Sequence, residues 1–238
     1  MTQETSPQIT LCIPVFNEEK TLPGLFSNLS SYFEKFLIPF EVVFCLDPSS
    51  DQSEKILEEA SRKNSAFRYL VNSRRQGRAR SLLRALQEAR SPYIAAASVD
   101  LSIPLGDLTK LLQSLAEKET AIAFGTRMDK KDSLFLSSTS KKNRLEITYL
   151  NIFWEQQKRQ FKDPFCSAFV FKKEIRDVLL LDLKASGWYL TQDLQQQVLK
   201  KNISFTEVPV YASTSSPSSF PYYRESLRLF FRSLNRQG

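Results

Sequence analysis

The 238-residue sequence predicts an α/β fold in which helices flank a mostly parallel central sheet. Short apolar runs alternate along the chain with longer segments in which apolar residues recur every three or four positions. Most apolar runs end in polar or turn-forming residues, as strands do where they leave a sheet. Neither an internal repeat nor a long linker divides the chain, so we expect one domain over residues 1–238.

Seven apolar runs are predicted to be strands, because each is short and bounded by polar residues. In chain order they are Ile9–Val15, Glu41–Leu46, Phe67–Val71, Tyr93–Val99, Ala121–Phe124, Phe165–Phe171 and Ile203–Val208. Cys12 and Cys45 lie within two of these strands, where a thiol packs as a small apolar group. The odd number and wide spacing of the cysteines, Cys166 being the third, favour free buried thiols and a reducing compartment.

Segments between the strands show the apolar spacing of helices. We expect helices over about 22–29, 52–62, 82–89, 108–115, 145–161, 188–200 and 222–236. Asn17 and Asp51 precede the first two and are predicted to cap them. The polar segment 129–143 is predicted to be a mobile loop.

The charge balance favours an anionic partner, because the formal net charge is +7 and the pI is near 9.3. Nucleic acid, membrane phosphates and a nucleoside diphosphate would all fit. No helix-turn-helix, RNP or zinc pattern accompanies the charge, so we do not expect nucleic acid as the partner. The sequence contains no histidine, so acid–base or metal chemistry has to use carboxylates.

The N-terminal residues lack the charged start and apolar core of a signal peptide. No apolar stretch approaches the roughly 20 residues of a membrane span. The predicted helix at about 222–236 is basic and amphipathic. It has the pattern of an interfacial helix on anionic lipid and also that of a helix packed on its own domain, and we favour the packed helix. We expect a cytoplasmic protein that can contact a membrane surface peripherally.

Ligands of open parallel sheets bind beyond the carboxyl ends of the strands. The residues there are polar or charged in five cases: Asn17–Glu19, Asp47–Asp51, Asn72–Arg80, Asp100 and Arg127. These segments should meet at one edge of the sheet. The sequence therefore predicts a functional rim that carries both acids and bases.

The content and order of these segments resemble glycosyltransferase family 2. Ile13–Glu19 is similar to its IPVYNEE opening, and Leu46–Asp51 to its DDGSSD turn. Further matches follow in order: Asn72–Ala79 to NxGKGxA, Ser98–Leu101 to DxDL, Phe124–Arg127 to the GSR segment, Asp163–Phe169 to DxxCGFK, and Glu207–Val210 to EVPV. The resemblance runs from about residue 9 to residue 235 and is strongest to the dolichyl- or polyprenyl-phosphate mannose or glucose synthases. It implies the GT-A fold, with the donor diphosphate at the end of the fourth strand.

The resemblance also implies roles for residues on the nucleotide side. The pocket for base and ribose would be lined by Pro14, Phe16 and Glu18. Asp47 would hydrogen-bond the base. The basic loop would place Arg75 and Arg78 near the nucleotide.

On the phosphate and acceptor side, Asp100 would approach both the metal and the diphosphate, and would be catalytic. Asp193, within Thr191–Leu194, would take the place of the family's acidic residue near the acceptor. Arg127 and Arg144 would contact phosphate groups. The donor would be a UDP- or GDP-hexose and the acceptor a lipid phosphate.

The sequence departs from the family pattern at positions that the resemblance assigns to metal binding and to the acceptor site. Ser98 replaces the first aspartate of DxD, and Thr191 the first acid of the acceptor-side pair. Leu46, Pro48, Ser102 and Ser167 are further departures. One metal-site carboxylate is left where two are usual, so Mg²⁺ or Mn²⁺ should bind more weakly.

Three outcomes stay open. A metal could be held by Asp100 and the diphosphate alone, or arginines of the basic loop, Arg74, Arg75, Arg78 and Arg80, could bind phosphate without a metal. Alternatively, the protein could retain binding and lack transfer. We expect a hexosyltransferase acting on a polyprenyl or dolichyl phosphate, with a binding-only relative of the enzymes as the second reading.

Overall fold

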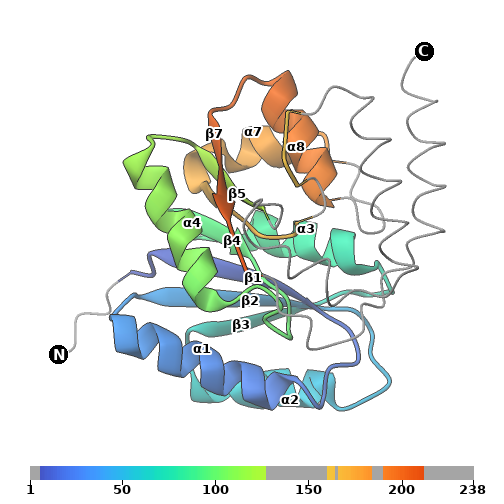
Figure 1. Ribbon diagram of the computed structural model, residues 1–238. Helices are drawn as coiled ribbons and strands as arrows, with labels where there is room; N and C mark the ends of the chain where they lie inside the picture. Colours follow the sequence, from blue (N-terminus) through green and yellow to red (C-terminus); the bar gives the residue numbers. More distant parts are fainter. Residues whose placement is uncertain (1–5, 127–159, 164–165, 184–189, 212–238) are drawn as a thin grey trace, which may run out of the picture.

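The computed structural model describes residues 6–126, 160–163, 166–183 and 190–211, and within these ranges the chain forms a seven-stranded sheet. The strand order is β3-β2-β1-β4-β6-β5-β7 (Figure 1). The strands are β1 (Ile9–Val15), β2 (Phe40–Leu46), β3 (Phe67–Val71), β4 (Tyr93–Ala96), β5 (Ile122–Thr126), β6 (Phe169–Lys172) and β7 (Phe205–Pro209).

The sheet is mostly parallel, as predicted. β1 pairs in parallel with both β2 and β4, β2 with β3, and β5 with β7. β6 lies between β4 and β5 and is antiparallel to both, which the sequence did not predict. Because β1 to β4 all run the same way, their carboxyl ends lie at one edge of the sheet.

The described helices cover both faces of the sheet. They are α1 (Leu22–Phe36), α2 (Ser53–Lys63), α3 (Arg78–Glu88), α4 (Leu105–Glu117), the 3₁₀ helix η1 (Lys173–Ile175), α7 (Arg176–Leu180) and α8 (Leu190–Lys200). α1, α2 and α4 pack on one face, and α3, α7 and α8 on the other. Within the described ranges, no helix combines the length and the apolar character needed to cross a membrane.

The two faces follow from the alternation of side chains along the strands. In β1, Leu11 and Ile13 join the core beneath α1, α2 and α4, while Cys12 joins the core beneath α3. Cys45 lies in the same core as Cys12, and Cys166 in the opposite one. All three cysteines are buried free thiols, as predicted. Burial raises the pKa of Cys45 to about 11, so this thiol is protonated at neutral pH.

The predicted strands extend furthest beyond the observed ones at the end of β4 and at the start of β6. β4 stops at Ala96 rather than at Val99, because the chain turns: the Leu101 N–H donates to the Ser98 carbonyl, and Leu101 has φ +47°. β6 starts at Phe169 rather than at residue 165. Apolar residues continue beyond both strand ends, so composition alone does not mark the turns.

Both cap predictions are wrong, because the capping residues are Thr21 before α1 and Gln52 before α2. α1 begins at Leu22, and Asn17 adopts a left-handed φ of +53° well before it. The Asp51 Oδ1 accepts the Ser53 N–H at 3.0 Å, which satisfies a donor in the first turn of α2. The predicted loop 129–143 and the helix 222–236 lie outside the described residues, as does nearly all of the predicted helix 145–161.

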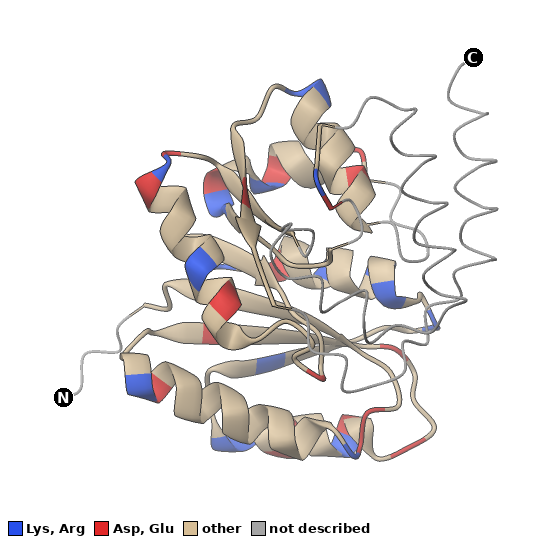
Figure 2. Ribbon diagram, in the orientation of Figure 1, with Lys and Arg blue, Asp and Glu red and all other residues tan. Residues whose placement is uncertain are grey.

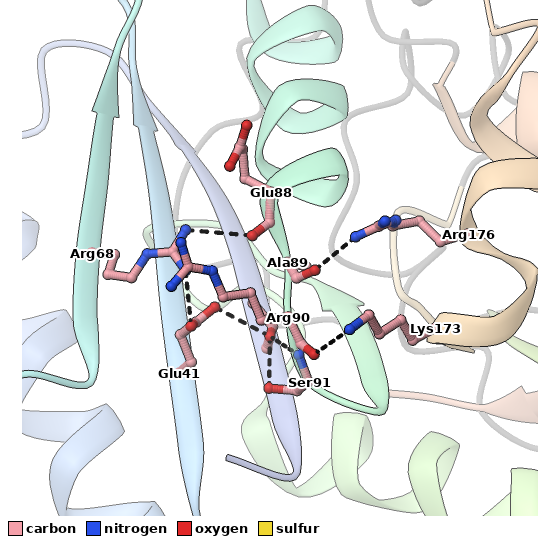
Figure 3. A network of polar contacts seen from close by, with 9 residues as sticks. Glu41, Arg68, Glu88, Ala89, Arg90, Ser91, Lys173 and Arg176 are labelled. Carbon is pink, nitrogen blue, oxygen red and sulfur yellow. Dashed lines mark hydrogen bonds and ion pairs between the residues drawn. The ribbon is translucent and has the colours of Figure 1, made fainter. Parts of the chain in front are cut away.

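Charged residues are nearly absent from the interior of the sheet and gather at strand ends and on helices (Figure 2). Glu41, near the amino end of β2, is a charged residue that is buried. Its carboxylate accepts from the Arg68 guanidinium at 3.0 Å and from the Thr10 hydroxyl at 3.4 Å. Figure 3 shows this network with the end of α3, where backbone carbonyls accept hydrogen bonds from Arg68, Lys173 and Arg176. Cations at a helix carboxyl end complement its dipole.

Replacing Arg68 with alanine is expected to lower the free energy of unfolding by about 2 kcal/mol, because the buried Glu41 carboxylate loses its ionic partner. Urea denaturation measures the change. Arg62→Ala is the matched control: it breaks an exposed pair with Glu58 in α2 and should cost less than about 0.5 kcal/mol. Equal effects of the two substitutions would contradict a structural role for the Glu41 network.

Candidate functional site

The loops that follow the four parallel strands β1 to β4 form the candidate site. Hydrogen bonds continue the sheet one residue further, from the Asp47 N–H to the Val15 carbonyl and from the Asn72 N–H to the Leu46 carbonyl. The ends of β1, β2 and β3 are therefore level with one another. The predicted meeting of polar strand ends at one edge is confirmed for these described segments.

The loops after β1 and β2 are joined by reciprocal hydrogen bonds. The backbone N–H groups of Asn17, Glu18 and Glu19 donate to side-chain oxygens of Ser49, Ser53 and Asp51, at 3.0, 2.8 and 3.0 Å. In return, the Asn17 Oδ1 accepts the Ser50 N–H, and the Glu19 Oε2 accepts the Gln52 N–H. The side chains of Asn17 and Glu19 are thus used to fix the loops.

Asp47 is the centre of a buried polar cluster that joins β2 to the loop after β3. Its side chain accepts hydrogen bonds from the Asn72 Nδ2 at 2.8 Å, the Ser81 hydroxyl at 3.0 Å, the Gln76 N–H at 3.1 Å and the Gly77 N–H at 2.7 Å. We call these five residues the Asp47 cluster. Only 3% of Asp47 is exposed.

The cluster is completed by Arg84 of α3. Its Nη1 donates to the Asn72 Oδ1 at 2.7 Å and to the Val71 carbonyl at 2.8 Å. The Asn72 Nδ2 also donates to the Ser81 hydroxyl. Asp47 and Asn72 could be identified from their motifs, whereas Ser81 and Arg84 were not predicted as part of the site. Their positions one and two turns into α3 give no signal, because nothing in the spacing shows which face of α3 meets β2.

Burial alone would raise the pKa of Asp47, but hydrogen bonds from Asn72, Gln76, Gly77 and Ser81 outweigh it and hold the pKa below its ordinary value of 3.8. A carboxylate with a lower pKa in the folded state contributes stability above its unfolded pKa. That contribution is lost as the pH falls through the folded pKa.

Wild-type protein is therefore expected to exceed Asp47→Asn in unfolding free energy at about pH 6, with the difference shrinking as the pH falls toward about 3. Urea denaturation of both proteins across this range measures it. Taking the difference cancels the contribution of Asp51, whose pKa is also lowered, and that of Glu207, whose pKa burial raises. A difference that is constant across this range would contradict the assignment.

The residues predicted to line the nucleotide pocket differ in how deeply they are buried. Pro14 is buried within β1, where it is level with Cys45 of β2. Phe16 and Glu18 follow the strand and are half-buried. The Arg75 guanidinium lies over the Phe16 ring, 4.1 Å from its centroid, in a cation–π contact. The structure thus brings the loops after β1 and β3 together at Phe16 and Arg75.

Glu18, Arg78 and Asp100 form a second group, which we call the Arg78 cluster. Burial lowers the pKa of the Arg78 guanidinium, and the nearby carboxylates of Asp100 and Glu18 oppose that change. A half-buried cation is thereby placed at the start of α3, whose first turn has no acidic residue. A helix amino terminus and a guanidinium both favour an anion.

Asp100 is tied into the turn after β4. Its Oδ1 accepts from the Ser98 hydroxyl at 2.5 Å and from the Ser102 N–H at 3.1 Å. Ser98, at the first DxD position, thus donates a hydrogen bond where the family has a second metal-binding carboxylate. In the part of the chain that the structure describes, no three Asp, Glu, Cys or His side chains form a group able to hold a metal ion.

The remaining predicted residues lie on α8 or outside the described ranges. Asp193 is buried in the first described turn of α8, where Leu190 and Leu194 pack into the core of β5 and β6. Its role near an acceptor stays a prediction. Arg127 and Arg144 lie outside the described residues.

The family of this protein follows from a comparison of its sequence with models of known families. The model of glycosyl transferase family 2 matches residues 10–177, well over half of the chain. The chain belongs to glycosyl transferase family 2. The resemblance of the sequence motifs is thereby confirmed. The matched range includes the Asp47 cluster, the Arg78 cluster and the Ser98–Ser102 turn.

This family 2 protein is similar in sequence to undecaprenyl-phosphate 4-deoxy-4-formamido-L-arabinose transferases of several bacteria. That of Proteus mirabilis is 26% identical over 181 residues, covering 75% of this chain and 53% of the relative. That of Photorhabdus laumondii is 25% identical, covering 76% and 54%. The chain thus spans about half the length of these relatives.

Solved structures with the same fold are more distant in sequence. Mannosyl-3-phosphoglycerate synthase from Rubrobacter xylanophilus superposes with a TM-score of 0.64 at 12% identity, covering 98% of this chain and 75% of that protein. A Pyrobaculum calidifontis mannosyltransferase, solved with GDP-mannose and Mn²⁺, has a TM-score of 0.60 at 14% identity, covering 94% and 65%. These similarities confirm the predicted GT-A fold of this family 2 protein.

Proposed function

We propose that this family 2 protein transfers a sugar from a nucleoside-diphosphate sugar to the phosphate of a polyprenyl lipid. The observation that carries the proposal is the position of Arg78, a half-buried cation at the amino terminus of α3 and near Asp100 at the carboxyl edge of the sheet. Support comes from the relatives, which are named as undecaprenyl-phosphate sugar transferases. Such a protein would work at the surface of a membrane, where its acceptor is embedded.

The chemistry of this transfer suits a chain without histidine. A lipid phosphate is already anionic near neutral pH, so its oxygen can attack the anomeric carbon without a strong base. The bond between that carbon and the donor diphosphate breaks as the new bond forms, and the nucleoside diphosphate leaves with the electron pair. Negative charge grows on the leaving diphosphate, and Arg78 with the amino terminus of α3 would stabilise it.

Asp100 is the residue that would hold Mg²⁺ or Mn²⁺, together with oxygens of the diphosphate. A bound divalent ion would supply further positive charge at the leaving group. A Mycobacterium tuberculosis glucosyl-3-phosphoglycerate synthase of the same fold was solved with Mn²⁺ and UDP. We propose that metal affinity is weaker here, because the Ser98 hydroxyl replaces a carboxylate and already donates to Asp100. Donor binding could then proceed without metal, through Arg78.

The remaining assignments extend the proposal to the rest of the site. Phe16 and Glu18 would line the base and ribose side with Pro14, and Arg75 would contact the nucleotide. Asp193 would act near the acceptor, and Arg127 and Arg144 would bind phosphate. The donor would be a UDP- or GDP-hexose.

A binding-only protein is the second candidate, and one observation favours it. Within the described residues, Asp100 lacks the acidic neighbours that would complete a metal site. A protein that retained Arg78 could bind a nucleotide sugar and fail to activate it. Binding without transfer separates this candidate from the first.

Calorimetric titration with UDP, GDP, UDP-glucose and GDP-mannose, each with and without Mn²⁺, tests the proposal first. We expect one base to be preferred and binding to persist without metal. A transfer assay with undecaprenyl phosphate and the preferred sugar nucleotide follows. Selective binding without transfer to this acceptor would favour the binding-only candidate. No binding of any of the four compounds would contradict both candidates.

A further inference from the structure

Asp47 differs from the other acidic residues of the rim in having its carboxylate directed inward. Its oxygens accept four hydrogen bonds from within the protein, and 3% of the residue is exposed. Two of these donors are the successive N–H groups of Gln76 and Gly77. Every donor comes from the loop after β3 or from the first turn of α3.

We infer that Asp47 is a positioning residue for Arg75 and Arg78, which it sets for the diphosphate of the donor, and that it does not contact the base. The inference rests on the proposed function. It replaces the role implied by the family resemblance with one argued from the contacts of this chain. Its basis is the order of the loop: Arg75 comes directly before the pinned pair Gln76–Gly77, and Arg78 directly after it.

The geometry of Gly77 shows why the loop needs this anchor. Gly77 has φ +84° and ψ +161°, a conformation that is essentially restricted to glycine. Its N–H donates to the Asp47 Oδ2 at 2.7 Å, and its carbonyl accepts the Ser81 N–H in the first turn of α3. The hydrogen bonds to Asp47 therefore fix the peptide orientation from which Arg78 begins the helix.

Arg75 is held from both sides of the site. Its guanidinium lies on the Phe16 ring of the β1 loop, while the next residue, Gln76, donates to Asp47 of the β2 loop. Three strand ends thereby determine where this cation lies. Without the carboxylate, the N–H groups of Gln76 and Gly77 would lose a charged acceptor, and the loop could adopt other conformations.

The base-contact role and the positioning role differ in which part of the donor is affected. A residue that contacts the base would alter the preference between UDP and GDP and would leave inorganic pyrophosphate unaffected. A residue that positions the arginines would weaken all three ligands by one common factor. That factor is the fraction of molecules in which the loop is correctly ordered.

Asp47→Asn with calorimetric titration of pyrophosphate, UDP and GDP is the test. The amide keeps the shape of the side chain and presents an N–H group to donors that need an acceptor. We expect the affinity for each ligand that binds wild type to fall about tenfold, because the loop would be correctly ordered in about 10% of the molecules. The ratio of the UDP affinity to the GDP affinity should not change. Glu41→Gln is the matched control, because it neutralises a buried carboxylate at the opposite end of the same strand. It should leave all affinities within about twofold.

Ser81→Ala serves if Asp47→Asn does not fold. It removes one of the four donors to Asp47 and should weaken pyrophosphate by about two- to threefold. A changed UDP-to-GDP ratio with unaltered pyrophosphate binding would overturn the inference in favour of a base contact. Unaltered affinities for every ligand that binds would overturn it outright. If wild type binds none of the three, the proposed function fails and the inference fails with it.

Discussion

Replacing Arg78 with alanine is expected to weaken the binding of a nucleoside diphosphate about 100-fold. A charge-assisted hydrogen bond to phosphate contributes about 1.5–3 kcal/mol, which is a factor of roughly 10 to 150 in affinity. The substitution also removes a cation whose charge interacts favourably with the carboxylates of Glu18 and Asp100. Those two acids would then repel the incoming diphosphate, which places the expected loss toward the upper end of the range.

Calorimetric titration of UDP and GDP without added metal measures this effect. Arg78→Lys keeps the charge and loses the planar fork of donors, so it should retain part of the affinity. Arg62→Ala removes the same charge from the exposed end of α2 and should leave affinity within about twofold, which controls for net charge. Equal losses in Arg78→Ala and Arg62→Ala would mean that the site responds to overall charge alone.

Ser98→Asp is expected to make donor binding depend on a divalent ion. The Ser98 hydroxyl is 2.5 Å from the Asp100 Oδ1, so a carboxylate in its place would bring two like charges together. Without metal, this repulsion should lower nucleoside diphosphate affinity about tenfold. With Mn²⁺, the two carboxylates and the diphosphate oxygens would form an oxygen site of the kind that such ions prefer, and the loss should be recovered.

The measurement is the ratio of affinities with and without Mn²⁺, for wild type and variant under the same conditions. Ser98→Asn controls for shape, because it has the outline of aspartate without the charge. We expect the ratio for Ser98→Asp to exceed that for wild type by about tenfold or more and the ratio for Ser98→Asn to match wild type. An unchanged ratio in Ser98→Asp would show that Ser98 does not set the metal dependence.

The sheet could be predicted closely because buried parallel strands are nearly continuous apolar runs. β1 and β3 begin and end where the sequence places them. The apolar run of β4 continues after the strand has ended, and that of β6 begins before the strand starts, so the run alone placed both boundaries wrongly. The antiparallel direction of β6 could not be predicted, because strand direction depends on the connections on either side and the run itself is the same in both directions.

The location of the site was predictable, and its internal contacts were not. Polar residues after parallel strands must meet at one edge, which places Glu18, Asp47 and Asp100 together. The sequence gives no sign that Asp47 faces inward or that Ser98 donates to Asp100. Such contacts depend on side-chain direction and loop conformation. Asp47 and Ser81 also lie tens of positions apart in the sequence, and the contact of Ser98 with Asp100 depends on how the turn after β4 folds.

The order β2-β1-β4 also has a consequence for how this site can change in evolution or by design. The chain leaves β1 toward β2 and leaves β4 toward β5, so the two connections run in opposite directions along the sheet. Ligands of open α/β sheets bind at such a point of reversal. Glu18 follows β1 and Asp100 follows β4, so the Arg78 cluster spans this point. The backbone topology therefore fixes where an anion is received, and substitutions such as that at Ser98 are free to alter how it is neutralised.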